Sequence, residues 1–322
     1  MSKSAKIWII SATALILMGC IIFSGVMTVF KWDFSRLATV KFETNNYEIS
    51  EEYKNISVVT NTADIILKKS ENSETSVVCY EQKNLKHTVE VNGETLEIKV
   101  IDTRKWYEYI GITIGKKSRI TVFLPDTEYG SLFIKGNTGD VEISEVFEFE
   151  SIDVSVTTGD IKNYAAADEK LKIKTTTGDI FAQNISAESM DFSVSTGDIN
   201  IKNANSKDKI NIKVSTGHAE LTDVNCGNLE TKGSTGDIYL KNVIASKDFH
   251  IERSTGNIKF DGCDATEIFI KTDTGHIKGG LLSEKVFIAR SDTGKIDVPK
   301  TATGGRCEVE TDTGDIKINI QR

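Results

Sequence analysis

One tripeptide, Thr-Gly-X followed by an apolar residue, recurs ten times between residue 138 and residue 316. Successive copies are 19 or 20 residues apart, and so regular a period is typical of repeat architectures in which each copy is one structural unit. The glycines stand at Gly139, Gly159, Gly178, Gly197, Gly217, Gly236, Gly256, Gly275, Gly294 and Gly314.

The residues around each glycine alternate between apolar and polar. The position seven before the glycine is apolar in all ten copies, whereas the position four before it is always polar. Apolar residues also occupy the positions five before, two after and four after, with Thr231, Asn163 and Gly279 as the exceptions. A period of two on both sides of the glycine indicates two short strands per repeat, each with one buried face.

These strands predict an all-β fold, a β-solenoid (β-helix-like) of about ten coils of 19 to 20 residues over residues 132–322. A single repeat cannot bury its own apolar row, whereas stacked repeats form a continuous core. Rungs about 4.8 Å apart would then build two parallel sheets. The alternative is an antiparallel β meander or sandwich with the glycines in hairpins, although Thr-Gly-Asp is not a favoured two-residue hairpin sequence.

For residues 31–131 the sequence predicts a juxtamembrane segment followed by degenerate repeats. The alternation returns around Ala63, which takes the place of the glycine, and residues 89–100 predict a hairpin about Asn92-Gly93. Residues 120–125 predict a strand that ends at Pro125. We expect this region to cap the end of the solenoid nearest the membrane, because an uncovered edge invites aggregation.

The N-terminus carries an apolar run that follows a short tail, residues 1–6. Residues 7–30 contain no charge, and as a helix they would reach about 36 Å, enough to cross a bilayer core. Trp8 and Trp32 flank the run where interfacial aromatics belong. We expect an uncleaved, single-pass signal anchor in a cell membrane, with residues 7–30 in contact with lipid and the C-terminal domain extracytoplasmic. A cleaved signal peptide is the alternative, and a lipoprotein box ending at Cys20 is another, although the apolar run continues beyond that cysteine.

The residue after each repeat glycine is most often aspartate. Asp140, Asp160, Asp179 and Asp198 stand in four successive copies and are weak candidates for calcium ligands. The structural reading is an Asx-type turn that satisfies local backbone N–H groups, and it is favoured because His218, His276 and Lys295 occupy the same place in other copies. In chain order Lys295 falls between His276 and Asp315 and would offset the charge of the latter.

The sequence gives little support for a catalytic site or a cofactor site. Three copies read Asp-Thr-Gly, as in aspartic proteases, but they are late members of a structural column, and the two column histidines lie three rungs apart, too far for one metal ion. Five scattered cysteines form no ligand pattern and are expected to be buried apolar residues. We expect no cofactor and no catalytic residue, and the net charge of −8 argues against a nucleic-acid partner.

The lead-in Ile120–Pro125 and the serial Thr-Gly-Asp-Ile blocks at 177–180, 196–199 and 235–238 resemble a bacterial family of β-strand-repeat proteins labelled putative adhesins, a domain of unknown function with LiaG-like envelope members. The resemblance covers about residues 40–322 and implies a membrane-tethered or secreted protein without established catalytic residues. We therefore expect a non-enzymatic adhesion, scaffold or envelope-stress accessory protein with an unknown protein or glycan partner in the envelope. The alternative is a polysaccharide-active enzyme on a pectate-lyase-like β-helix.

Overall fold

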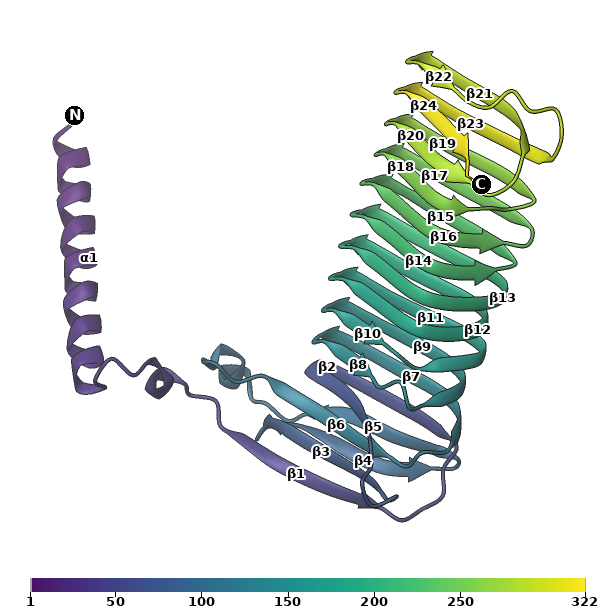
Figure 1. The fold of residues 1–322 in the computed structure, drawn as a ribbon. Coiled ribbons are helices and arrows are strands. Elements are labelled where there is room, and N and C mark those ends of the chain that lie inside the picture. The colour runs from purple at the N-terminus through teal and green to yellow at the C-terminus, as the bar shows by residue number, and fades with distance from the viewer. Residues whose placement is uncertain (1, 322) are drawn as a thin grey trace.

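The computed structural model describes residues 2–321, which form one apolar helix and a long stack of β-strands (Figure 1). The helix α1 (Lys3–Val29) lies apart from the β structure, and eighteen of its residues form a window of mean hydropathy 2.3. It is long and apolar enough to span a membrane, and a signal sequence would have the same character. A 3-10 turn, η1 (Phe34–Leu37), follows and leads into the first strand.

The repeats build a parallel β-solenoid, as their alternation predicts. Each copy aligns with its neighbours in register, so that Ile152 pairs with Leu171 in one sheet and Ile161 pairs with Ile180 in the other. Because neighbouring copies run parallel, the antiparallel meander is wrong for this part of the chain. The strands concerned are β7 (Glu128–Thr138), β8 (Val141–Ile143), β9 (Glu148–Thr158), β10 (Ile161–Asn163), β11 (Ala166–Thr177), β12 (Ile180–Thr196), β13 (Ile199–Thr216), β14 (Ala219–Cys226), β15 (Asn228–Thr235), β16 (Ile238–Ala245), β17 (Asp248–Thr255), β18 (Ile258–Cys263), β19 (Glu267–Thr274) and β20 (Ile277–Leu281).

One apolar core runs the length of the stack, and it accommodates the three exceptions to the alternation. The Phe260 ring covers Gly279 so closely that a Cβ there would lie 2.2 Å from a ring carbon. Asn163 is fully buried and donates its side-chain N–H to the carbonyl of Ala165 (2.9 Å). Thr231 is also fully buried, and its hydroxyl has no hydrogen-bond partner among the described residues.

The N-terminal end is closed by a cap that mixes both kinds of pairing. The strand β2 (Asn55–Lys69) forms a complete coil, and β5 (Thr95–Asp102) and β6 (Ser118–Leu124) pair parallel with its two halves as a coil split by an insertion. The remaining strands, β1 (Phe42–Ile49), β3 (Thr75–Gln82) and β4 (Leu85–Asn92), pair antiparallel. The expected hairpin is present, with Asn92 opposite Thr95 across the β4–β5 turn.

At the other end the coils are not stacked in chain order. The strand β23 (Gly305–Thr313) lies between β19 and β21 (Lys285–Thr293), so Cys307 pairs with Ile268 on one side and with Phe287 on the other. Likewise β24 (Ile316–Ile320) lies between β20 and β22 (Ile296–Asp297). The chain therefore forms its outermost coil first and then returns to insert residues 305–320 beneath it. This overturns the expectation that Lys295 lies between His276 and Asp315.

A second bend, opposite the glycines, has its own column of residues whose backbone is in the left-handed conformation. Asn184, Asn203, Asp223 and Asn242 have φ between 51° and 56°, a conformation that asparagine and aspartate tolerate better than other non-glycine residues. The side-chain amide of Asn203 donates to Asn184 and that of Asn242 donates to Asp223, each at 2.8 Å. Sequence reasoning missed this column, although its polar residues recur at the repeat period.

Candidate functional site

The bend that carries the repeat glycines is built by hydrogen bonds between successive rungs. Asp140 Oδ1 accepts the backbone N–H of Asp160 (3.0 Å), and Asp160 Oδ1 accepts the N–H of Asp179 (2.8 Å). The series begins one rung earlier than the repeats, since Asp64 accepts the N–H of Asp140 (3.1 Å). Each side chain thus satisfies a donor of the next coil rather than one in its own turn. We call this series the acceptor column, and its members in spatial order are Asp64, Asp140, Asp160, Asp179, Asp198, His218, Asp237, Asn257, His276, Asp315 and Lys295.

The glycine is required at this bend by both conformation and contact. Gly197 has a φ of 137°, and a Cβ there would lie 2.1 Å from the carbonyl oxygen of Gly178. The same close approach recurs along the column, because adjacent bends stack directly on one another. Only Ala63, at the N-terminal start of the series, departs from glycine.

Histidine serves in the acceptor column through its Nδ1 atom. His218 Nδ1 accepts the N–H of Asp237 (3.0 Å), and His276 Nδ1 accepts that of Asp315 (2.9 Å), so both rings must be neutral with the proton on Nε2. Lysine cannot accept a hydrogen bond, and Lys295 stands at the last rung, where it only donates its backbone N–H to Asp315 (2.9 Å). Every residue of the column that has to accept such a bond is therefore an aspartate, an asparagine or a histidine.

Two carboxylates of the acceptor column have pKa values below the usual one. Burial opposes ionisation of Asp237, but hydrogen bonds from the Asn257 backbone N–H (2.7 Å) and the Tyr239 hydroxyl (2.7 Å) outweigh it and lower the pKa of Asp237 below its usual value. The backbone N–H of Lys295 lowers the pKa of Asp315 in the same way. Both side chains are thereby held ionised as acceptors.

The four calcium candidates lie on adjacent rungs of this column, as their spacing predicted. One carboxylate oxygen of each, Oδ1, accepts a backbone N–H of the next coil. Calcium binding by Asp140, Asp160, Asp179 and Asp198 stays a prediction, which titration calorimetry with Ca²⁺ would check. Further along the bend a shallow cavity of about 580 Å³ follows four rungs from Thr235 to Gly314.

A buried polar cluster lies between the cap and the first coil. Glu81 is fully buried, and its carboxylate accepts the backbone N–H of His87 (2.7 Å), the His87 Nδ1–H (2.6 Å) and the Asn45 amide (2.7 Å). The Thr60 hydroxyl lies 2.8 Å from His87 Nε2. Hydroxyl, imidazole and carboxylate thus stand in the order of a hydrolytic triad, but Thr60 is only 3% exposed. The hydrogen bonds of the cluster join β2, β3 and β4 to one another.

The same cluster holds the one group of possible metal ligands found in residues 2–321, formed by Cys79, Glu81 and His87, whose donor atoms lie within 4.8 Å of one another. Burial raises the pKa of the Cys79 thiol to about 12, so it stays protonated. The polar atoms of Glu81 and His87 already have hydrogen-bond partners. A metal ion would therefore have to displace an existing network. Of the other cysteines, Cys226, Cys263 and Cys307 are buried as expected, whereas Cys20 is exposed on α1.

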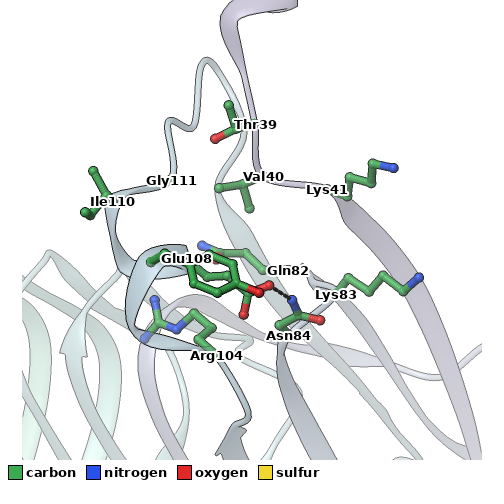
Figure 2. A pocket seen from close by; sticks show the side chains of 11 residues that line it. Thr39, Val40, Lys41, Gln82, Lys83, Asn84, Arg104, Glu108, Ile110 and Gly111 are labelled. Atoms are coloured by element: carbon green, nitrogen blue, oxygen red, sulfur yellow. Dashed lines mark hydrogen bonds between the residues drawn. The ribbon is translucent and has the colours of Figure 1, made fainter.

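A pocket of about 560 Å³ lies where the segment after α1 meets the cap (Figure 2). Its wall is formed by three segments distant in sequence, 39–41, 82–84 and 104–111, with Glu108 hydrogen-bonded to the Asn84 amide (2.5 Å). Lys41, Lys83 and Arg104 contribute basic groups, and Val40, Tyr107 and Ile110 contribute apolar surface. No repeat signal marks this pocket in the sequence, and sequence reasoning missed it.

Comparison with known proteins gives one family and several similar structures. A family model described as Toastrack DUF4097 matches residues 53–218 and 202–322. A putative adhesin from Bacteroides fragilis is 16% identical with a TM-score of 0.40 and covers 87% of this chain and 97% of its own. A putative lipid binding protein from Parabacteroides distasonis is 17% identical with a TM-score of 0.47 and covers 88% of this chain and 98% of its own. No curated protein is similar to the chain.

Proposed function

The chain belongs to the Toastrack DUF4097 family, and from this membership and the geometry above we propose that it is a membrane-anchored, extracytoplasmic and non-enzymatic protein that presents its solenoid for adhesion or scaffolding. A role as an accessory in envelope stress would use the same surface. The helix α1 supports the anchor, because its length and hydropathy suit a membrane span.

The observation that carries this proposal is the periodic polar face of the sheet in which Ile152 pairs with Leu171, here called the first sheet, the other being the second. Lys172 and Asp153 form an ion pair between neighbouring rungs (2.9 Å), and Lys232 pairs with Glu230 on its own strand (2.9 Å) and Glu252 on the next (3.7 Å). Groups of both signs thus recur along the rod at the rung spacing of about 4.8 Å. A surface with this period fits a partner that also repeats, such as an envelope polysaccharide or an extended polypeptide.

The acceptor column supports a structural rather than a catalytic use of the bend. Its side chains are engaged in backbone hydrogen bonds from rung to rung, and the same place accepts aspartate, asparagine or histidine. A catalytic site would need specific groups free to meet a substrate. Turnover of any glycan by the purified full-length chain would contradict a non-enzymatic function.

The decisive experiment combines topology with binding. Protease treatment of intact cells should remove the β domain of the full-length protein, and protection of that domain would contradict the extracytoplasmic placement. Cosedimentation of proteoliposomes with purified cell-wall glycan should be lost in Lys174→Glu/Lys213→Glu/Lys232→Glu, on the face of the first sheet. The matched control is Lys162→Glu/Lys202→Glu/Lys259→Glu on the second sheet. If neither triple variant changes binding, the polar faces do not bind this glycan.

A further inference from the structure

The insertion that splits the coil formed by β5 and β6 exposes an unusual number of apolar side chains. Within residues 103–117, Trp106 is 79% exposed and Ile110 is 74% exposed, and Tyr107, Tyr109 and Ile112 are each more than half exposed. Apolar groups of this size gathered in one short segment mark an interaction site, whereas scattered ones do not. We call this segment, residues 103–117, the aromatic loop.

The aromatic loop has a defined conformation. Its 3-10 turn, η2 (Trp106–Ile110), is held by Glu108, which accepts the backbone N–H of Lys105 (2.7 Å) and the Asn84 amide. Arg104 forms two hydrogen bonds to Asp102 (2.7 and 2.9 Å) and lies over the Tyr109 ring, 4.4 Å from its centroid. These contacts keep the apolar side chains on the outside, so their exposure is a property of the fold.

Basic residues surround the apolar ones. Lys105, Lys116 and Lys117 lie in the loop, and Lys41 and Lys83 lie at the adjoining pocket. None of these five lysines forms an ion pair with the residues that the structure describes. A protein of net charge −8 thus has a locally basic surface at this place, which is complementary to an anionic one.

The aromatic loop is bonded to the segment that follows α1. The backbone N–H of Thr39 donates to the carbonyl of Ile112 (3.0 Å), and the N–H of Ile112 donates to the Thr39 hydroxyl (3.0 Å). Gly111 lies against Val40 so closely that a Cβ would be 2.6 Å from Val40 Cγ2. Phe30 and Thr39 are nine positions apart, which limits the distance from the helix end to the loop to about 30 Å. In Figure 1 the loop lies on the side of the cap that faces this connection.

We propose that the aromatic loop binds the surface of the bilayer that α1 spans, with its aromatic side chains in the interfacial layer and its lysines against anionic phospholipid headgroups. This inference rests on the membrane anchor of the proposed function. Tryptophan and tyrosine prefer the interfacial layer because they have an apolar body and a polar tip. Lysine side chains are attracted by the negative surface potential of an anionic leaflet.

This second attachment would fix the base of the solenoid. With α1 alone, the rod would be attached to the membrane at one point, whereas the link between Thr39 and Ile112 makes binding of the loop to the same bilayer intramolecular. The cap would then rest against the headgroups. The angle between rod and membrane would be set by the loop.

The test places a single tryptophan in the loop of the full-length protein. The variant Trp8→Phe/Trp32→Phe retains Trp106, and it is reconstituted into vesicles of phosphatidylcholine and phosphatidylglycerol that contain a lipid with a quencher near the headgroup. We expect the Trp106 emission to fall to about half or less, as for an interfacial indole. Vesicles of phosphatidylcholine alone, or the added changes Lys105→Gln/Lys116→Gln/Lys117→Gln, should reduce the quenching severalfold.

Two further single-tryptophan variants control the result. Trp32→Phe/Trp106→Phe retains Trp8 and reports insertion of α1, and Ile288→Trp in a background without the native tryptophans reports an apolar position on the outermost coil. Quenching at Trp8 but not at Trp106 overturns the loop proposal and leaves the anchor intact, whereas no quenching at either position overturns the anchor as well. Equal quenching at residue 288 overturns the proposal by showing unspecific contact. A Trp106 spectrum that shifts with protein concentration but is not quenched would assign the loop to a second copy of the chain.

Discussion

The Nδ1 atom of His276 accepts a hydrogen bond from the backbone N–H of Asp315, 2.9 Å away, although the two residues are 39 positions apart. Every other bond of the acceptor column between residues 140 and 276 joins residues 19 or 20 positions apart. The doubled separation arises because the coil that carries Lys295 has been displaced outward by one rung. The order of the last three coils is thus the least expected feature of the fold.

Crosslinking can check this order. Thr274 and Thr313 are paired in adjacent strands, as are Thr313 and Thr293, whereas Thr274 and Thr293 are two rungs apart. Oxidation should therefore join cysteines in Thr274→Cys/Thr313→Cys but not in Thr274→Cys/Thr293→Cys, as read by mobility in non-reducing gels. The reverse pattern would mean that the coils stack in chain order.

The acceptor column should depend on hydrogen-bond acceptance and not on charge. Asp179→Ala removes the acceptor of the Asp198 N–H (2.8 Å), and we expect a loss of about 0.5–1.5 kcal/mol in the free energy of unfolding. Asp179→Asn keeps an acceptor and should cost less, whereas Asp179→Lys should cost at least as much as alanine. Urea denaturation measures all three, and equal values for Asn and Ala would contradict the role of the bond.

The repeat glycines should resist substitution more strongly than an ordinary turn glycine. Gly197→Ala combines a φ of 137° with a Cβ 2.1 Å from a carbonyl oxygen, so neighbouring rungs must separate. Gly93→Ala, in the β4–β5 hairpin, has a φ of 61° and open space around the Cβ, and it should cost only about 1–2 kcal/mol. Thermal unfolding of the two variants should show a larger loss of Tm for Gly197→Ala.

Asp237 should make stability depend on pH in the acid range. Burial raises the pKa of Asp237, but the hydrogen bonds from Asn257 and Tyr239 to the carboxylate outweigh it and hold the pKa below its usual value in the folded chain. A lowered folded pKa contributes stability above the unfolded pKa, and this contribution is lost as the pH falls through the folded value. The stability difference between the native chain and Asp237→Asn should thus be constant near neutral pH and shrink below about pH 4. A difference that grows on acidification would have the wrong sign.

Arg253 is a buried cation whose replacement should stabilise the fold. It is 2% exposed, and its Nη1 atom donates to the Val214 carbonyl (2.8 Å) across Gly233, but Nε and Nη2 have no partner in the described structure. Burial without a carboxylate in contact lowers the pKa of Arg253. We expect Arg253→Leu to gain about 1–4 kcal/mol in urea denaturation, as for other buried charges replaced by apolar groups. Arg290→Leu, at an exposed position, is the control, and a loss of stability in Arg253→Leu would contradict the prediction.

Much of the fold is predictable from the sequence because the core depends on a local period. Alternation about Gly178 or Gly197 predicts the strands, their buried faces and their parallel register, and the hairpin at Asn92-Gly93 follows from turn chemistry. The inserted coil is not predictable from the period, since each coil can pair with any other of the same pattern. Lys295 does carry the information, because a residue that cannot accept a hydrogen bond belongs at an end of the acceptor column.

The features of the cap do not follow the repeat period. Glu81 and His87 form their cluster through strands of the cap that break the solenoid pattern, so their spacing in the chain carries no period. The aromatic loop lies in an insertion, and from the sequence alone Trp106 and Ile110 could equally be core residues. Only the fold shows that they are exposed.

The insertion of residues 305–320 beneath the outermost coil also constrains how the rod is completed. During synthesis, β21 emerges before β23, the strand on which it rests in the finished fold. The rod therefore cannot grow at this end by simple addition of one finished rung to the next. Its final step is the closure of a gap, and the strand that closes it gains two neighbours at once.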